Sequence, residues 1–306
     1  MEIFLPIAEM SVHWLEILAV GFGVGFLAGM FGIGGGFLLT PLLIFFGIPP
    51  AVAVASGTSQ ITAVTFSGVL AQWKRRAVDF KMGGVMISGG IVGTLIGVVV
   101  FGWLARLGQM EIAISLSYVV LLGTVGALML NESVRVLIAD RRHGARPSTV
   151  HEPHNWLQKL PFKTRFRESK LYISALPPAV LGLAIGFLSS VLGVGGGFVA
   201  VPVMIYLFRM PTNVVVGTSL LLLLAVTSAA TLLHAASDFS VDIVLAAILI
   251  CGGVAGVQYG VRAGTRLRGE QLRFLMALLV LAVAVRLFAG LVVTPADVYS
   301  IRTALP

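Results

Sequence analysis

The sequence predicts an all-α, polytopic membrane protein built from two inverted-topology repeats with paired discontinuous or re-entrant helices. Three observations lead to this fold class. Of the 306 residues, 58% are hydrophobic and only 11% are charged, whereas a soluble domain has about 25% charged residues. The apolar residues gather in long segments that are separated by more polar loops. A glycine-rich phrase occurs twice, once in each half of the chain.

The apolar segments are candidate membrane helices, because a helix needs ~20 apolar residues to cross a bilayer. They cover residues 14–31, 36–48, 51–73, 82–105, 111–131, 172–192, 197–208, 213–234, 241–261 and 272–293. Segments 36–48 and 197–208 are too short to cross comfortably, and each directly follows a glycine phrase. The sequence leaves open whether these two segments cross or re-enter, since re-entrant backbone needs support from protein or a water-filled cavity.

The glycine phrases read GMFGIGGGFLLTP from Gly29 to Pro41 and SVLGVGGGFVAVP from Ser190 to Pro202. Each glycine in a helix interior costs ~1 kcal/mol relative to alanine, so three adjacent glycines predict a break in a helix. The likeness continues downstream, where both GTS and VD recur in the same order. We therefore expect three parts: a first transmembrane repeat (1–131), a basic cytoplasmic linker (132–170) and a second transmembrane repeat (171–306).

The distribution of Lys and Arg predicts the orientation, because cytoplasmic loops are enriched in both. If the N-terminus lies outside and each glycine phrase separates a pair of segments that returns the chain to its starting side, the basic clusters at 74–81 and 262–273 face the cytoplasm with the linker. Each repeat then makes an odd net number of crossings, so the two repeats are inverted. We expect a multi-pass protein of the cell inner membrane with both termini outside.

Several function classes find no support in the sequence. The phrase GIGGG lacks the Gly-Lys-Ser/Thr ending that a phosphate-binding loop requires. The sequence also offers no cluster of a nucleophile, a histidine and a carboxylate that could form a catalytic triad. We therefore predict no enzyme activity, no cofactor and no metal site. The net charge of +8 lies mainly in the loops, where it reflects topology, so we expect no nucleic-acid partner. Asp79 and Asp242 stand at predicted helix starts and are interpreted as N-caps.

Other glycines recur every fourth residue, a spacing that lets membrane helices approach closely. They are Gly21, Gly25 and Gly29 in the first half and Gly252, Gly256, Gly260 and Gly264 in the second. We interpret these glycines as packing positions.

The glycine phrases are the candidate anion site. A helix that restarts at membrane depth presents free backbone N–H groups and the positive end of its dipole, and both attract an anion. Under the inverted arrangement, the two short helices can direct their N-termini at one central point. The predicted backbone donors are Gly34, Gly35, Gly36, Gly195, Gly196 and Gly197. The alternative is that these glycines only permit tight helix packing.

Polar side chains complete the predicted site. Thr58, Ser59, Thr218 and Ser219 fall at matching positions of the two halves, and Gln60 follows the first pair. The alternative for each hydroxyl is a hydrogen bond to a carbonyl of its own helix. Gln258 and Arg286 are weaker candidates within predicted spans.

Two of the span residues have an alternative at the membrane edge. For Arg286 this is snorkelling of its charge to the membrane interface. His234 is interpreted as a membrane-edge histidine, with a proton-linked gate as the alternative.

The paired phrases, each followed by GTS and VD, resemble the TauE/SafE sulfite exporter family, also called the 4-toluene sulfonate uptake permease family. The resemblance covers nearly the whole chain apart from the first dozen residues and the central linker. It implies a bacterial inner-membrane carrier for sulfur-containing anions such as sulfite or organosulfonates. The expected function is thus a secondary transporter that moves such an oxyanion by alternating access.

Two alternatives to the transporter stay open: a passive anion channel, and a membrane scaffold that acts through the central loop. The expected partners are the small anion and the lipid bilayer, and the arrangement is compatible with a homodimer.

Overall fold

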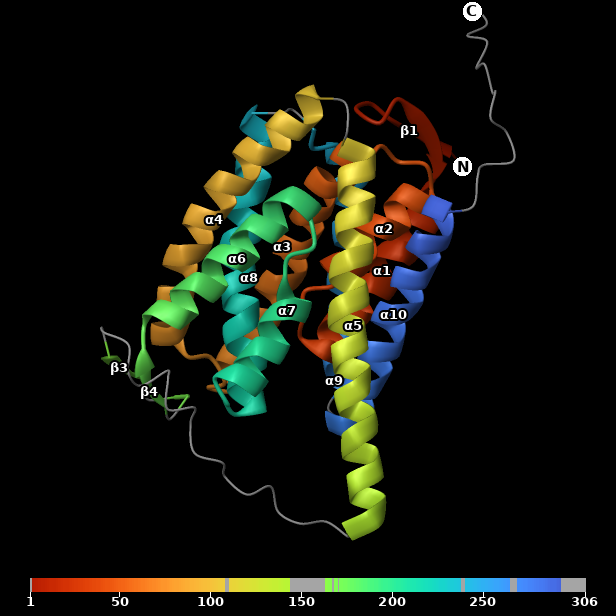
Figure 1. Ribbon diagram of the computed structural model, residues 1–306. Coiled ribbons are helices and arrows are strands. Elements are labelled where there is room, and N and C mark those ends of the chain that lie inside the picture. Colours follow the sequence, from red (N-terminus) through yellow and green to blue (C-terminus); the bar gives the residue numbers. More distant parts are fainter. Residues whose placement is uncertain are drawn as a thin grey trace, which may run out of the picture.

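The structure, a computed structural model, is a bundle of helices with two small β-hairpins (Figure 1). It describes residues 2–107, 110–143, 163–166, 168–169, 171–237, 240–264 and 269–292. In the first half the elements are β1 (Glu2–Leu5), β2 (Met10–His13), α1 (Trp14–Phe31), α2 (Gly36–Phe45), α3 (Pro50–Lys74), α4 (Phe80–Arg106) and α5 (Met110–His143). In the second half they are β3 (Lys163–Phe166), β4 (Leu171–Ser174), α6 (Leu176–Leu192), α7 (Gly197–Pro202), the π-helical turn η1 (Val203–Leu207), α8 (Thr212–Ser237), α9 (Ile243–Gly264) and α10 (Gly269–Val292).

Each predicted apolar segment contains a helix, although residues 172–174 of the segment 172–192 belong to strand β4, and the all-α fold class is confirmed. Four helices of the described residues are long and apolar enough to cross a membrane, namely α1, α4, α9 and the part of α8 from Val214 to Ser237. The helix α2 has 10 residues and is therefore about 15 Å long, half of the ~30 Å hydrocarbon thickness. Neither α2 nor α7 crosses a bilayer alone, and α5 continues as a helix to His143.

The two hairpins are features that the sequence analysis did not predict. β1 pairs with β2 and β3 pairs with β4, both antiparallel. Each hairpin directly precedes the first long helix of its half, α1 or α6. Figure 1 shows the two hairpins at opposite ends of the bundle.

Helices of one half pack mainly against helices of the other half. The first helix of each half lies along the fourth helix of the other, so that α1 contacts α9 and α6 contacts α4. The third helices, α3 and α8, pack together, as do α5 and α10. The core is therefore shared between the halves.

Small residues allow the closest of these contacts. A Cβ atom added to Gly25 would lie 2.2 Å from the carbonyl oxygen of Gly253 in α9, and one added to Gly186 would lie 2.0 Å from that of Gly90 in α4. A Cβ at Gly256 or Gly260 would be as close to backbone atoms of α1. The prediction that these glycines are packing positions is confirmed.

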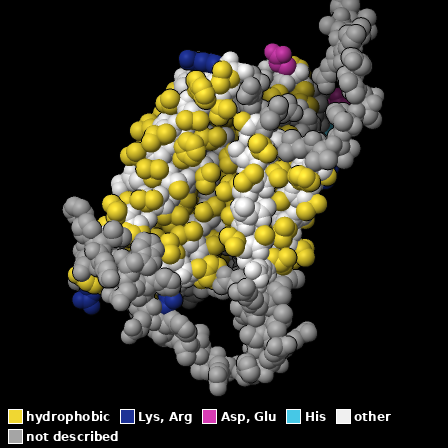
Figure 2. All heavy atoms as spheres, in the orientation of Figure 1, with side chains coloured by type: hydrophobic (Ala, Val, Ile, Leu, Met, Phe, Trp, Pro, Cys, Tyr) yellow, Lys and Arg dark blue, Asp and Glu magenta, His cyan; other side chains and the backbone are white. Residues whose placement is uncertain are grey.

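The outer surface carries large apolar side chains, including Val99, Leu232 and Ile243, which are more than two-thirds exposed at 73%, 70% and 78%. Figure 2 shows hydrophobic side chains over the visible face of α4, α5 and α6, with Lys and Arg at its ends. Such a contiguous apolar surface is unfavourable in water and suits a lipid environment. This distribution agrees with a multi-pass membrane protein.

Candidate functional site

Both glycine phrases break the helix, as predicted. The helix α1 ends at Phe31, and the N–H of Gly32 donates to the carbonyl of Ala28 across 2.8 Å. Gly34 and Gly35 both have a φ of 78°, and their counterparts Gly195 and Gly196 both have a φ of 71°. This left-handed region is costly for residues with a Cβ atom. The two turns therefore depend on glycine.

The two breaks meet in the middle of the protein. A Cβ atom on Gly36 would lie 2.4 Å from the carbonyl oxygen of Val194, and one on Gly197 would lie 2.1 Å from that of Ile33. The rings of Phe37 and Phe198, one residue further, have centroids 5.7 Å apart. The short helices α2 and α7 thus begin beside each other, each against the loop of the opposite half.

Backbone amides gather where α2 and α7 begin. Leu38 and Leu39 donate their N–H groups to the carbonyl of Gly35, and Val199 and Ala200 donate to that of Gly196. The N–H groups that precede these donors stand in the first turn, where a helix offers them no acceptor of its own. The residues of both breaks are buried. The junction therefore combines two helix N-termini with tight glycine packing, which are the two interpretations that the sequence left open.

The hydroxyls of Thr58 and Ser59 both donate to the carbonyl of Ala55 in their own helix, at 2.7 and 3.4 Å. Thr58 also accepts a hydrogen bond from Thr231 at 3.1 Å. One turn along, the hydroxyls of Thr62 and Thr227 are 2.8 Å apart. These contacts form a polar seam between α3 and α8.

The second predicted hydroxyl pair makes contacts between the halves. The Thr218 hydroxyl accepts from the Asp79 N–H at 3.1 Å. The Ser219 hydroxyl lies 3.3 Å from the carbonyl of Gly32, at the first glycine phrase, and 3.0 Å from the carbonyl of Val216. Of the predicted hydroxyl residues, Ser219 is the one that the contacts of the described residues bring to the glycine junction.

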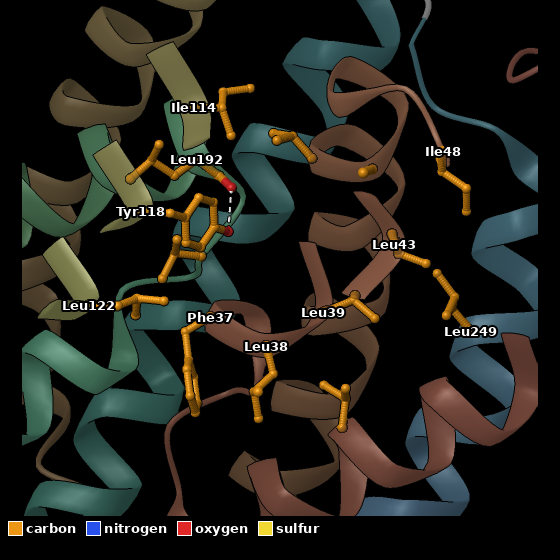
Figure 3. Close-up of a cluster of buried hydrophobic side chains, with 14 of the residues drawn as sticks. Phe37, Leu38, Leu39, Leu43, Ile48, Ile114, Tyr118, Leu122, Leu192 and Leu249 are labelled. Carbon is orange, nitrogen blue, oxygen red and sulfur yellow. Dashed lines mark hydrogen bonds between the residues drawn. The ribbon is translucent and has the colours of Figure 1, made fainter. Parts of the chain in front are cut away.

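Three further side chains hold the second glycine phrase, and two of them, Tyr118 and Thr40, were not among the residues predicted from the sequence. Tyr118 of α5 donates its hydroxyl to the carbonyl of Leu192 at 2.8 Å, as Figure 3 shows beside Phe37 and Leu38. The Thr40 hydroxyl of α2 lies 3.3 Å from the carbonyl of Gly193. His234 Nε2 lies 3.0 Å from the carbonyl of Ser190. His234 is fully buried, so its side chain faces the protein interior, and it lies in the last turn of α8. Its interpretation as a membrane-edge residue, with a proton-linked gate as the alternative, stays a prediction.

Gln60 is fully buried at the crossing of α1, α3 and α9. Its Nε2 donates to the carbonyl of Gly21 at 3.2 Å, and among the described residues its Oε1 has no hydrogen-bond partner. A Cβ atom on Gly253 would lie 2.5 Å from that Nε2. The side chain fills the space that the glycines leave open.

Gln258 and Arg286 do not join the glycine junction. Both are exposed on the outer side of the bundle. The Arg286 guanidinium lies over the ring of Phe45, with its central carbon 5.0 Å from the ring centroid. Gln258 lines a separate cavity between α3 and α9. The position of Arg286 on the outer surface agrees with the snorkelling alternative.

Asp79 caps α4, as predicted, and also connects the two halves. Its Oδ1 accepts from the N–H groups of Lys81 and Met82 at 3.1 and 2.9 Å. Its Oδ2 accepts from both the N–H and the hydroxyl of Ser169, in the β3–β4 turn, at 3.1 and 2.6 Å. We call the contact between Asp79 and Ser169 the first latch.

Asp242 repeats this arrangement at α9. Its Oδ1 accepts from Val244 and Leu245 at 3.0 and 3.1 Å, so it is an N-cap as predicted. Its Oδ2 accepts from the N–H of Ile7, in the β1–β2 turn, at 2.9 Å. The Asp242 N–H donates to the hydroxyl of Ser56 at 3.0 Å. We call the contact between Asp242 and Ile7 the second latch.

Known proteins are similar to this chain over most of its length. The sequence model of the family described as Sulfite exporter TauE/SafE matches residues 17–287. The probable membrane transporter protein YjnA of Bacillus subtilis is 30% identical over 276 residues, which are 89% of this chain and 99% of that protein. A probable membrane transporter protein of Xylella fastidiosa is 29% identical over 282 residues, 88% of this chain and 93% of that protein.

A shorter match links the chain to a plant protein. The Sulfite exporter TauE/SafE family protein 5 of Arabidopsis thaliana is 50% identical over 47 residues, 15% of this chain and 10% of that protein. No solved structure matches with significance. With the family model covering residues 17–287 and relatives named as membrane transporters, the chain belongs to the TauE/SafE sulfite exporter family of membrane transporters.

Proposed function

We propose that the protein is a secondary transporter that moves a small sulfur-containing oxyanion, sulfite or an organosulfonate, across the bacterial inner membrane by alternating access. The observation that carries this proposal is the meeting of α2 and α7 at their N-termini, shown by the contacts of Gly36 with Val194 and of Gly197 with Ile33. The family description supplies the class of anion.

The chemistry of the junction suits an oxyanion. Helix N-termini bind anions through backbone N–H groups and the helix dipole. Neither glycine phrase contains a charged residue, so the anion would be held by neutral donors and could leave again. The Ser219 hydroxyl stands beside the first phrase and adds a donor from the second half.

The substrate pathway opens, in this proposal, when the two phrases separate. In the structure the Val194 and Ile33 carbonyls occupy the space over Gly36 and Gly197. Movement of one half against the other would expose the amides to one side of the membrane at a time.

The two latches are placed so that they could act as gates during this motion. Each joins the fourth helix of one half to the hairpin of the other, and the hairpins lie at opposite ends of the bundle (Figure 1). The two latches are equivalent contacts at opposite ends of the bundle, and this arrangement supports inverted repeats. Opening toward either side would release one latch and keep the other.

Counterflow in proteoliposomes tests the proposal. Vesicles loaded with unlabelled sulfite, an organosulfonate or sulfate receive a trace of the labelled anion outside. We expect uptake that is stimulated by internal sulfite or sulfonate and not by sulfate. Flux without stimulation from the opposite side would identify a channel. An absence of flux from folded protein with every anion tested would contradict transport and direct attention to the central loop.

A further inference from the structure

A cationic cavity of about 510 Å³ lies between α3 and α9, apart from the glycine junction. Lys74 and Arg75 stand at the end of α3, and Arg262 stands near the end of α9. The other lining residues are Ser67, Gly68, Leu70, Ala71, Val257, Gln258 and Val261. Among the described residues, the lining of this cavity contains three cationic side chains and no carboxylate.

A second cavity at the same end of α3 shows the contrast. It measures about 580 Å³ and also has three cations, from Arg76, Lys81 and Arg165. Its lining, however, includes the carboxylates of Asp79 and Glu168. Because its two carboxylates offset two of its three cations, the described lining of this cavity carries less positive charge than that of the first.

The walls of the first cavity are apolar and reach the outer surface. Leu70 is 41% exposed and Tyr259, next to Gln258, is 58% exposed. Val257 packs with Ala28 and Val64 in a small cluster of its own, against which Val261 also packs. The cavity therefore has a cationic group at the helix ends and an apolar wall along the helices. A small soluble anion has no apolar surface to bury against such a wall, whereas a lipid has both a charged headgroup and apolar acyl chains.

We propose that the α3–α9 cavity binds an anionic phospholipid, with the phosphate of its headgroup at Lys74, Arg75 and Arg262 and an acyl chain along Leu70. The shared chemistry is a tetrahedral phosphate, and the lipid is the source that the apolar wall favours. Basic pockets between membrane helices bind anionic headgroups in this way. Gln258 and Ser67 offer further hydrogen bonds to the headgroup. The proposal is independent of transport and of the glycine junction.

The test compares two variants that each lose three positive charges. Lys74→Gln, Arg75→Gln and Arg262→Gln are combined in one, and Arg76→Gln, Lys81→Gln and Arg165→Gln in the matched control. Native mass spectrometry of the detergent-solubilised protein measures binding of phosphatidylglycerol and phosphatidylcholine. We expect wild type to prefer phosphatidylglycerol and the first variant to lose about fivefold in affinity per charge removed. The control variant should keep most of the preference.

Three outcomes would overturn the proposal: an equal loss in both variants, an unchanged preference in the first variant, or no preference in wild type. Inorganic phosphate tests the soluble source. If phosphate alone stabilised wild type against heating as much as phosphatidylglycerol, and the first variant abolished this effect, the site would be one for a soluble anion. The single variants Lys74→Gln and Arg262→Gln repeat the lipid measurement if the triple variant does not fold.

Discussion

The carboxylate of Asp79 lies 2.6 Å from the hydroxyl of Ser169, although 90 residues separate the two in the chain. Asp79 caps the fourth helix of the first half, and Ser169 belongs to the hairpin at the start of the second half. Asp242 makes the corresponding contact with Ile7. Both aspartates are buried, and each therefore has a part in the cohesion of the two halves as well as in capping its helix.

Replacement of Asp79 by alanine is expected to lower stability by about 2–4 kcal/mol. An N-cap contributes ~1 kcal/mol, and the substitution also leaves the buried N–H of Ser169 without its acceptor at about 1–3 kcal/mol. Thermal denaturation of the detergent-solubilised protein measures the change. Glu168→Gln is the control, because Glu168 stands next to Ser169 and is exposed. Equal stability of Asp79→Ala and wild type would show that the first latch has no energetic role.

Alanine at Gly25 should lower stability, whereas alanine at Gly23 should leave it equal or raise it. Both glycines lie in α1, but a Cβ atom at Gly25 would lie 2.2 Å from the carbonyl oxygen of Gly253, while one at Gly23 would meet nothing within 4 Å. Overpacking costs about 1–3 kcal/mol, whereas alanine improves helix propensity by ~1 kcal/mol. Gly25→Ala should therefore melt at a lower temperature than wild type and Gly23→Ala at an equal or higher one. A Gly25→Ala protein as stable as Gly23→Ala would contradict the α1–α9 crossing.

Leucine at Gly35 and at Gly196 should abolish counterflow. Both positions have positive φ, and a Cβ atom would come within 2.9 Å of Ala28 at Gly35 and within 2.7 Å of Ile185 at Gly196. Uptake is normalised to protein that elutes as a single species from size-exclusion chromatography. Gly84→Leu is the matched control, since its Cβ atom would be in open space. Normal counterflow by both junction variants at normal expression would mean that the junction is not the anion site.

Leucine at Gln60 should leave the fold intact. The substitution removes a buried Oε1 that has no partner among the described residues. It also removes the hydrogen bond from Nε2 to the carbonyl of Gly21. The Gly21 carbonyl lies inside α1 and keeps its intrahelical N–H partner, so the substitution leaves no buried group without a partner. We therefore expect a change within about 1 kcal/mol. The corresponding position of the second half is Leu220. Counterflow that falls while the melting temperature holds would assign Gln60 to transport; a loss of more than about 2 kcal/mol would contradict the expectation of a neutral change.

The local part of the architecture could be predicted from the sequence, because helix breaks and caps depend on neighbouring residues. Consecutive glycines such as Gly34 and Gly35 mark a break wherever they occur in an apolar segment, and Asp79 before an apolar run marks an N-cap. Small residues at every fourth position of a helix, such as Gly21 and Gly25, indicate a face that packs against another helix. They do not reveal the partner helix, which the structure identifies as α9.

The long-range part could not be predicted, because it depends on how helices pair and rotate. Arg286 and Gln258 look like candidates for an internal site from their depth in a span, yet rotation of their helices places both on the outer surface. Tyr118 resembles any aromatic residue of a membrane helix, and only the packing of α5 brings its hydroxyl to Leu192. The hairpins were missed because their strands have 4 residues each.

The pairing of α1 with α9 has a consequence for biogenesis. The glycine face of α1 is synthesised first, but the helix that covers it is not made until the second half follows. During synthesis this face, like the turn that carries Ile7, has no native neighbour. The insertion machinery or lipid must occupy it in the meantime. A ribosome that stalls between the halves would leave a membrane-inserted fragment with an open seam, which quality-control proteases can recognise.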